Sequence, residues 1–139
     1  MNFAGGELQR RANELSGSRF VGGRAERFEL DGRLQLIALL QRGLTPDSPV
    51  VDVGCGALRA GYWLIHFLDE GMYHGMDPTR ERVDAARAAI LEPGLEKAKW
   101  PRFSYNGDFN LGVFDLAPRF VLARSIWSHA AKCLASGRQ

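Results

Sequence analysis

The sequence has few cysteines, no long apolar run and little net charge, and each shortage excludes a class of protein. Its two cysteines, Cys55 and Cys133, are too few for a zinc tetrad or a disulfide framework. No apolar stretch approaches the roughly 20 residues that a membrane-spanning helix needs, and no charged-then-apolar leader opens the chain. We therefore expect free thiols, no membrane partner and a cytoplasmic location.

The charge is too evenly balanced to indicate a polyanionic partner. A net charge of +2 arises from 18 basic and 16 acidic residues, and the arginines are scattered rather than clustered. Proteins that bind nucleic acid usually gather basic residues in one patch, so we expect no nucleic-acid partner. The 139 residues, 45% hydrophobic and 24% charged, are typical of one soluble globular domain.

Apolar periodicity predicts an N-terminal helical segment over 1–45 and an α/β core over 46–139. Helices are expected within the first 20 residues, over 25–44 with an interruption near Asp31 and Gly32, and over 58–68 and 78–94. Strands are expected over 49–53, 72–77, 102–107 and 119–125. Because strands that alternate with helices pair in parallel, the predicted fold is an α/β, Rossmann-like parallel sheet with flanking helices.

The first strand ends abruptly on glycine in "VVDVGCGALRAG", residues 50–61. Glycines at the carboxyl end of a parallel strand let a ligand approach backbone N–H groups without a Cβ in the way, so Gly54 and Gly56 are expected to form a pocket floor. The dinucleotide fingerprint would need a third glycine where this chain has Arg59, and no Walker Gly-Lys-Ser/Thr is present. Nicotinamide chemistry is therefore disfavoured, and a phosphate loop is excluded.

Two acidic residues accompany the glycine turn. Asp52 lies two positions before the first glycine, and Asp77 ends the next predicted strand, 21 residues after Gly56. That spacing lets a carboxylate accept hydrogen bonds from both hydroxyls of a ribose. The alternative is that Asp77 only caps the helix that begins after Pro78. The pattern fits an adenosine group without a diphosphate.

These residues resemble a known family. "VVDVGCGALRAG" followed by "YHGMDPTRERVDAAR" resembles motif I and the acidic end of strand two in the class I S-adenosylmethionine-dependent methyltransferases, and "NGDF" and "FVLARSIWSH" are similar to the later motifs. The GCG-x-LR-x-G variant and the upstream "GRLQLIALLQRGL" resemble a bacterial subgroup of small-molecule or sugar-cluster methyltransferases. The resemblance covers about residues 24–130.

The resemblance implies S-adenosylmethionine as cofactor, with a role for each matched position. Gly54, Cys55 and Gly56 would face its methionyl and ribose portion. Asp77 would hold the ribose hydroxyls, and Asp52 would contact the methionyl ammonium directly or through water.

The resemblance implies further roles at the later motifs, and two arginines are candidates from their positions beside the glycine turn and in the upstream "GGR" turn. Asp108 would accept from the adenine amino group with Phe109 against the ring, although a turn aspartate is an equal alternative. Arg124, with Ser125, would lie beside the sulfonium. Arg59, like Arg24, is a candidate partner for the cofactor carboxylate, although a surface arginine is the favoured interpretation of both. His129 is a weaker candidate for a general base, because methyl transfer depends mainly on alignment.

The sequence departs from that family in length. The family's sheet has seven strands in the order 3-2-1-4-5-7-6, whereas this sequence supplies about four. Strand four, "RFVLA", would then be an exposed apolar edge that favours self-association. The chain is either a fragment of a longer enzyme, which we favour, or a protein that pairs edge to edge, or a degenerate remnant.

We expect a methyltransferase acting on an unidentified small molecule, or the cofactor-binding portion of one. The alternative is a non-catalytic nucleotide-binding or partner-binding remnant of the same fold. No catalytic residue and no metal ligand is predicted.

Overall fold

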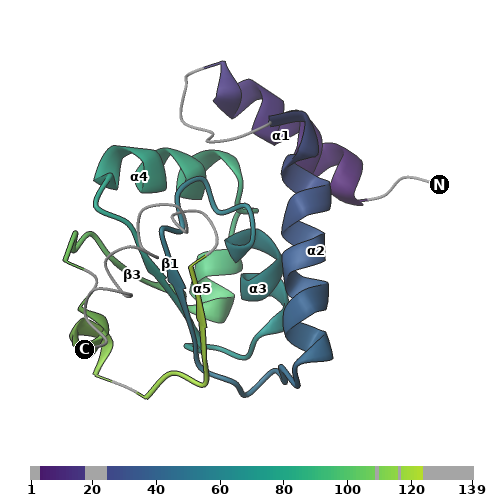
Figure 1. The fold of residues 1–139 in the computed structure, drawn as a ribbon. Coiled ribbons are helices and arrows are strands. Elements are labelled where there is room, and N and C mark those ends of the chain that lie inside the picture. Colours follow the sequence, from purple (N-terminus) through teal and green to yellow (C-terminus); the bar gives the residue numbers. More distant parts are fainter. Residues whose placement is uncertain (1–3, 18–24, 109, 116, 124–139) are drawn as a thin grey trace, which may run out of the picture.

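The computed structural model describes residues 4–17, 25–108, 110–115 and 117–123, and Figure 1 shows their arrangement. The elements follow in chain order: α1 (Ala4–Ser16), η1 (Ala25–Arg27), α2 (Phe28–Gln41), β1 (Val50–Val53), α3 (Gly61–Phe67), β2 (Tyr73–Met76), α4 (Arg80–Ala89), α5 (Leu95–Lys99), β3 (Arg102–Ser104), η2 (Leu111–Phe114) and β4 (Phe120–Leu122). Within these ranges, no helix has the length and apolar character needed to cross a membrane.

The four strands form one parallel sheet in the order β3-β2-β1-β4. This confirms the predicted Rossmann-like α/β fold, and each strand lies within its predicted range. β1 is central and buried along its whole length, which explains its almost unbroken run of valines. β1 pairs with β2 on one side and with β4 on the other. The chain first adds strands on one side of β1 and then crosses to the other side, so the carboxyl end of β1 lies at the switch point of the sheet.

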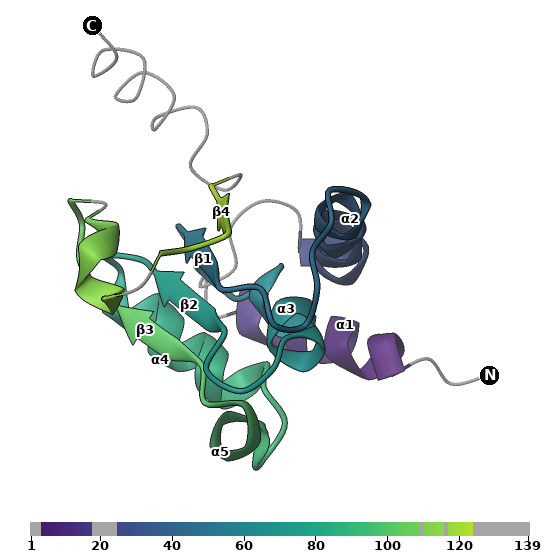
Figure 2. The ribbon, with the colours of Figure 1, turned by 90° about the horizontal axis from the view of Figure 1, so that it is seen from below.

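The two faces of the sheet are covered differently. Alternate residues of a strand point to opposite faces, so Val50 and Tyr73 pack with the helices in the main core, while Val51 and Met76 pack with Phe114 of η2. Figure 2 shows α1, α2 and α3 on the same side of the sheet. The main core lies between β1, β2 and these helices, and it also includes Val83 and Ala86 of α4.

Helix α2 runs unbroken from Phe28 to Gln41, so the expected interruption near Asp31 and Gly32 is wrong. Gly32 is a packing residue instead, because a Cβ at this position would lie 2.1 Å from the carbonyl oxygen of Arg59. The missing side chain lets α2 approach the backbone just before α3. The outer face of α2 remains apolar, with Leu30, Leu34, Ile37 and Leu40 between 40 and 46% exposed.

Two other boundaries differ from the sequence-based expectation. α3 begins at Gly61 rather than at residue 58, because Leu58 adopts a left-handed φ of 66° and still belongs to the turn after β1. The helix expected over 78–94 ends at Ala89, and the short helix α5 then follows Gly94, which has a φ of 85°. Pro93 and Gly94 therefore lie directly before α5 and beyond the end of α4.

We predict that Gly32→Ala destabilises the protein although alanine is the better helix former. Its methyl group would collide with the backbone oxygen of Arg59, and overpacking of this kind costs about 1–3 kcal/mol. Gly6→Ala in α1 is the matched control, since nothing lies within 4 Å of its Cβ, and it should stabilise the protein by about 0.5–1 kcal/mol. Urea unfolding of both variants checks this, and equal effects of the two substitutions would contradict it.

Candidate functional site

The turn after β1 is built from left-handed residues. Gly54, Gly56 and Leu58 have φ values of 74°, 51° and 66°, and all three are buried. Glycine adopts this region without the steric cost of a Cβ, which explains the two glycines of the sequence motif. The chain thereby leaves the end of β1, folds against the end of β2 and then enters α3.

The backbone donors of this turn are already used within the protein. Gly54 N and Cys55 N both donate to the carbonyl oxygen of Met76, at 2.7 and 3.0 Å. Gly56 N donates to Oδ2 of Asp77 at 3.0 Å. These three N–H groups tie the turn to the end of β2, which corrects the expectation that they face a ligand. The carbonyl oxygen of Cys55 also accepts within the turn, from Leu58 N at 2.9 Å.

Asp77 bridges the two strand ends. Its Oδ2 accepts from Gly56 N, and its Oδ1 accepts from Thr79 N at 2.8 Å, just before α4 begins. Thr79 is the N-cap of α4, so the bond to Asp77 forms a turn just before the helix and is not the helix cap that the alternative expected. The residue is buried, with 6% of its surface exposed, and each carboxylate oxygen has a second lone pair with which to accept another donor.

Asp52 is held from the neighbouring strand by a tyrosine that the sequence analysis missed. The hydroxyl of Tyr73 donates to Oδ2 of Asp52 at 2.7 Å, and both residues are buried. Among the described residues, no group donates to the other oxygen, Oδ1. Burial raises the pKa of Asp52 to about 7, and the nearby Asp77 carboxylate adds to this, while the Tyr73 hydrogen bond lowers it. The sequence did contain a signal for this pair, because Tyr73 lies in a buried strand next to the strand that carries Asp52.

Cys55 is a wall of the site and not a nucleophile. Burial raises the pKa of its thiol well above the usual range, and the Asp52 and Asp77 carboxylates raise it further. A thiol in such surroundings stays protonated, and only the thiolate attacks electrophiles. Its sulfur also packs closely on β2, since a Cβ at Gly75 would lie 3.1 Å from it.

Two of the predicted contacts lie elsewhere or have local partners. Arg59 Nη1 lies 3.5 Å from Oδ2 of Asp31, and its guanidinium packs over the ring of Phe28, so this side chain contacts α2. Asp108 is exposed, and its Oδ1 accepts from Asn110 N, as expected of the turn-aspartate alternative. Six residues singled out in the sequence lie outside the described residues: Arg24, Phe109, Arg124, Ser125, His129 and Cys133.

The site is rich in acceptors. Asp52 and Asp77 place two buried carboxylates at the ends of adjacent strands, while the N–H groups between them are occupied. The two carboxylates favour a ligand that brings hydroxyl donors or positive charge. The side chain of Arg82 from α4 also reaches this turn, since a Cβ at Gly56 would lie 3.7 Å from its Cδ. Among the described residues, no group of three His, Cys, Asp or Glu side chains forms a metal site.

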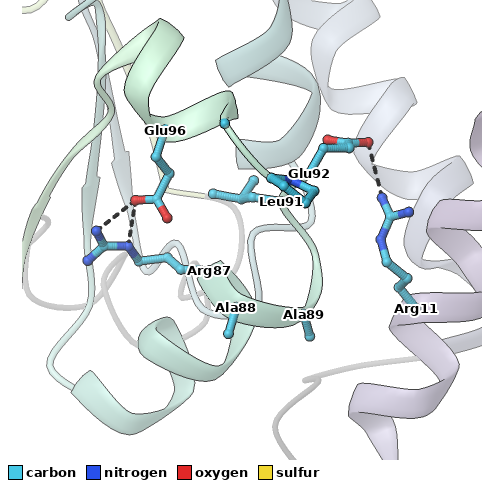
Figure 3. A pocket seen from close by; sticks show the side chains of 9 residues that line it. Arg11, Arg87, Ala88, Ala89, Leu91, Glu92 and Glu96 are labelled. Atoms are coloured by element: carbon cyan, nitrogen blue, oxygen red, sulfur yellow. Dashed lines mark hydrogen bonds and ion pairs between the residues drawn. The ribbon is translucent and has the colours of Figure 1, made fainter.

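A hollow of about 350 Å³ lies elsewhere, between α1, α4 and α5 (Figure 3). Its charges are neutralised internally, because Arg11 pairs with Glu92 at 3.2 Å and Arg87 pairs with Glu96 at 2.7 Å. The hydroxyl of Tyr62 also donates to Glu92. These contacts join α1 to the core and leave no net charge to attract a ligand. The lining residues are Arg11, Arg87, Ala88, Ala89, Leu91, Glu92, Pro93, Gly94 and Glu96.

Comparison of the chain with protein-family models, with curated proteins and with solved structures finds no match. The function of the chain must therefore be inferred from the geometry of the site.

We predict that Asp52→Asn stabilises the protein above neutral pH. The pKa of Asp52 in the folded protein is about 7, above the ordinary value of 3.8, so stability falls as the pH rises through this window. The amide cannot ionise and keeps an oxygen for the Tyr73 hydroxyl. At pH 8 the variant should be roughly 2–4 kcal/mol more stable than the native protein, and at pH 4 about equally stable.

Urea unfolding at the two pH values measures this difference. Asp69→Asn serves as the control, because Asp69 is exposed and its substitution should have little effect at either pH. A variant that is no more stable than the native protein at pH 8 would contradict the prediction.

Proposed function

We propose that this chain binds S-adenosylmethionine at the carboxyl ends of β1 and β2 and forms a methyltransferase, or the cofactor-binding portion of one, that acts on a small molecule. The observation that carries the proposal is the bond between Gly56 N and Oδ2 of Asp77, 3.0 Å long. It brings the carboxylate at the end of β2 directly against the glycine turn at the end of β1.

The position of this bond in the sheet supports the proposal. β1 lies between β2 and β4, and open parallel sheets bind ligands outside the carboxyl ends of the strands at such a reversal. The resemblance in the sequence points to the same two strand ends. The finer assignment of the fold to the methyltransferase type is part of this proposal.

The chemistry of the site supports a nucleoside that carries positive charge. Asp77 would accept from the two ribose hydroxyls through lone pairs that Gly56 and Thr79 leave free. Asp52 would accept from the methionyl ammonium through Oδ1, with the carbonyl groups of the turn beside it. A dinucleotide would instead bring its phosphates against two carboxylates, which is unfavourable.

S-adenosylmethionine would supply a methyl group on a positively charged sulfur, which passes to an oxygen, nitrogen or carbon of the acceptor. The described residues would contribute binding and orientation, and alignment of the reacting atoms is the main requirement for this displacement. The buried free thiol of Cys55 fits the reducing, cytoplasmic setting that we propose for this activity.

A second candidate is a nucleotide-binding or partner-binding protein without turnover. It is favoured by the fact that both oxygens of Asp77 already accept within the protein, so the turn needs no ligand to hold its shape. Production of S-adenosylhomocysteine that depends on an added acceptor would distinguish the two functions.

Calorimetric titration with S-adenosylmethionine and S-adenosylhomocysteine tests the proposal. We expect both to bind, and Asp77→Asn to weaken binding by about 30-fold or more, because a buried site made for hydroxyl donors loses its charged acceptor. Asp69→Asn is the matched control and should bind normally. Absence of binding by the native protein, or equal affinities for the Asp77 variant and the native protein, would refute the proposal.

We also propose that the chain self-associates through β4. In the described part of the chain this strand pairs only with β1, and Val121 is 50% exposed. An apolar edge strand favours pairing with another chain, and a charged side chain on it opposes such pairing. Sedimentation velocity should show concentration-dependent association of the native protein and less of it in Val121→Lys. A native protein that stays monomeric at high concentration contradicts this.

A further inference from the structure

Tyr73 and Asp52 form a closed pair beneath the start of α3. Tyr73 is 2% and Asp52 4% exposed, and the hydroxyl lies 2.7 Å from Oδ2. Asp52 is also two residues from Gly54, at the proposed ammonium position. Oδ2 of Asp52 therefore accepts from the tyrosine, and Oδ1 has no donor among the described residues.

The surrounding residues fix the phenol in place. A Cβ at Gly61 would lie 2.5 Å from the Tyr73 hydroxyl oxygen, so the first residue of α3 packs directly over it. On the other side, the ring of Phe103 meets the Tyr73 ring edge-on, with 6.1 Å between their centroids. The hydroxyl therefore has little freedom to turn away from Asp52.

The groups that face Asp52 are acidic or apolar. Tyr73 faces it from β2, and the carboxylate of Asp77 and the thiol of Cys55 lie near it at the strand ends. On β4, Leu122 is the residue paired with Asp52 in the sheet. From α3, Gly61 packs against the Tyr73 hydroxyl. No described cation accompanies the carboxylate, so its charge is available for a cation from outside.

We propose that Tyr73 is a positioning residue that holds Asp52 with one oxygen free for the cationic end of the ligand, and that this pair makes binding of that end depend on pH. The inference rests on the proposed function, since it assigns the ligand group that Asp52 meets. It names a side chain that the family resemblance does not assign.

The direction of the pH dependence follows from the state of the carboxyl group. With its pKa at about 7, Asp52 is mostly neutral at pH 6 and mostly charged at pH 8. Affinity for a cationic group should therefore rise over this range, by about tenfold. Loss of the tyrosine hydroxyl removes a hydrogen bond that favours the charged form, so it should move the midpoint upward by about one pH unit.

Two measurements test the proposal. NMR titration of protein labelled with ¹³C at the aspartate carboxyl carbons follows Asp52 without any ligand, and Asp52→Asn assigns its signal. Calorimetry at pH 6, 7 and 8 then compares S-adenosylhomocysteine, which has the ammonium, with 5′-methylthioadenosine, which lacks it. Tyr73→Phe is the test variant, and Tyr105→Phe, which removes a hydroxyl that bonds to Asp84 and Arg87 away from the site, is the control.

The expected result is an Asp52 midpoint near pH 7 that rises in Tyr73→Phe and stays unchanged in Tyr105→Phe. S-adenosylhomocysteine should bind about tenfold more weakly at pH 6 than at pH 8, and 5′-methylthioadenosine equally at both. An Asp52 midpoint below pH 5 in the native protein would overturn the inference even if both nucleosides bind. An equal pH dependence for the two nucleosides would also overturn it.

Failure of the proposed function looks different. If neither nucleoside binds at any pH while Asp52 titrates near pH 7, the nucleoside assignment falls, and the ligand role of the pair falls with it. Tyr73 would then retain only its effect on the titration of Asp52.

Discussion

The hydrogen bond from Gly56 N to Asp77 is the contact on which the arrangement of the carboxyl ends of β1 and β2 depends. It joins the residues that follow β1 to the residue that follows β2, and the two bonds to the Met76 carbonyl reinforce it. Through the second oxygen of Asp77 the same carboxylate also organises the start of α4. One side chain thus fixes the relative positions of two strands, a turn and a helix, which makes the geometry of this edge independent of any ligand.

Burial of acidic groups at this edge opposes folding. A carboxylate that is enclosed without a cation is disfavoured in its charged form, and the raised pKa of Asp52 expresses that cost. Asp52 is the one polar residue of β1, and among the described residues only the Tyr73 hydroxyl donates to it. Residues that weaken a fold in this way are commonly found where the protein binds a ligand.

Much of this architecture was predictable from the sequence, because it depends on local patterns. A valine-rich run ending on Gly54 indicated β1, short apolar runs indicated the other strands, and their alternation with helices predicted parallel pairing. The sequence places Asp77 at the end of the second strand, 21 residues after Gly56, and the structure shows that the two are in contact. What the spacing did not reveal is that the N–H groups of Gly54 and Cys55 donate to the Met76 carbonyl, since that depends on the register of β1 against β2.

The errors have a common physical origin in contacts between distant segments. Gly32 was interpreted as a helix breaker, but it is small because another backbone passes 2.1 Å from where its Cβ would be. Tyr73 escaped notice because its partner lies on the neighbouring strand, 21 residues earlier in the chain. Local sequence patterns do not record such encounters, so packing glycines and buried polar pairs become visible only in three dimensions.

The buried thiol of Cys55 can be used to follow local opening of the structure at the carboxyl ends of β1 and β2. Its sulfur lies between the glycine turn and β2, and its surroundings keep it protonated and shielded from water. Reagents that modify cysteine reach such a group only during brief local opening of the structure. The rate at which Cys55 is alkylated thus reports how often the turn detaches from β2, and any compound that clamps the turn shut will slow that reaction.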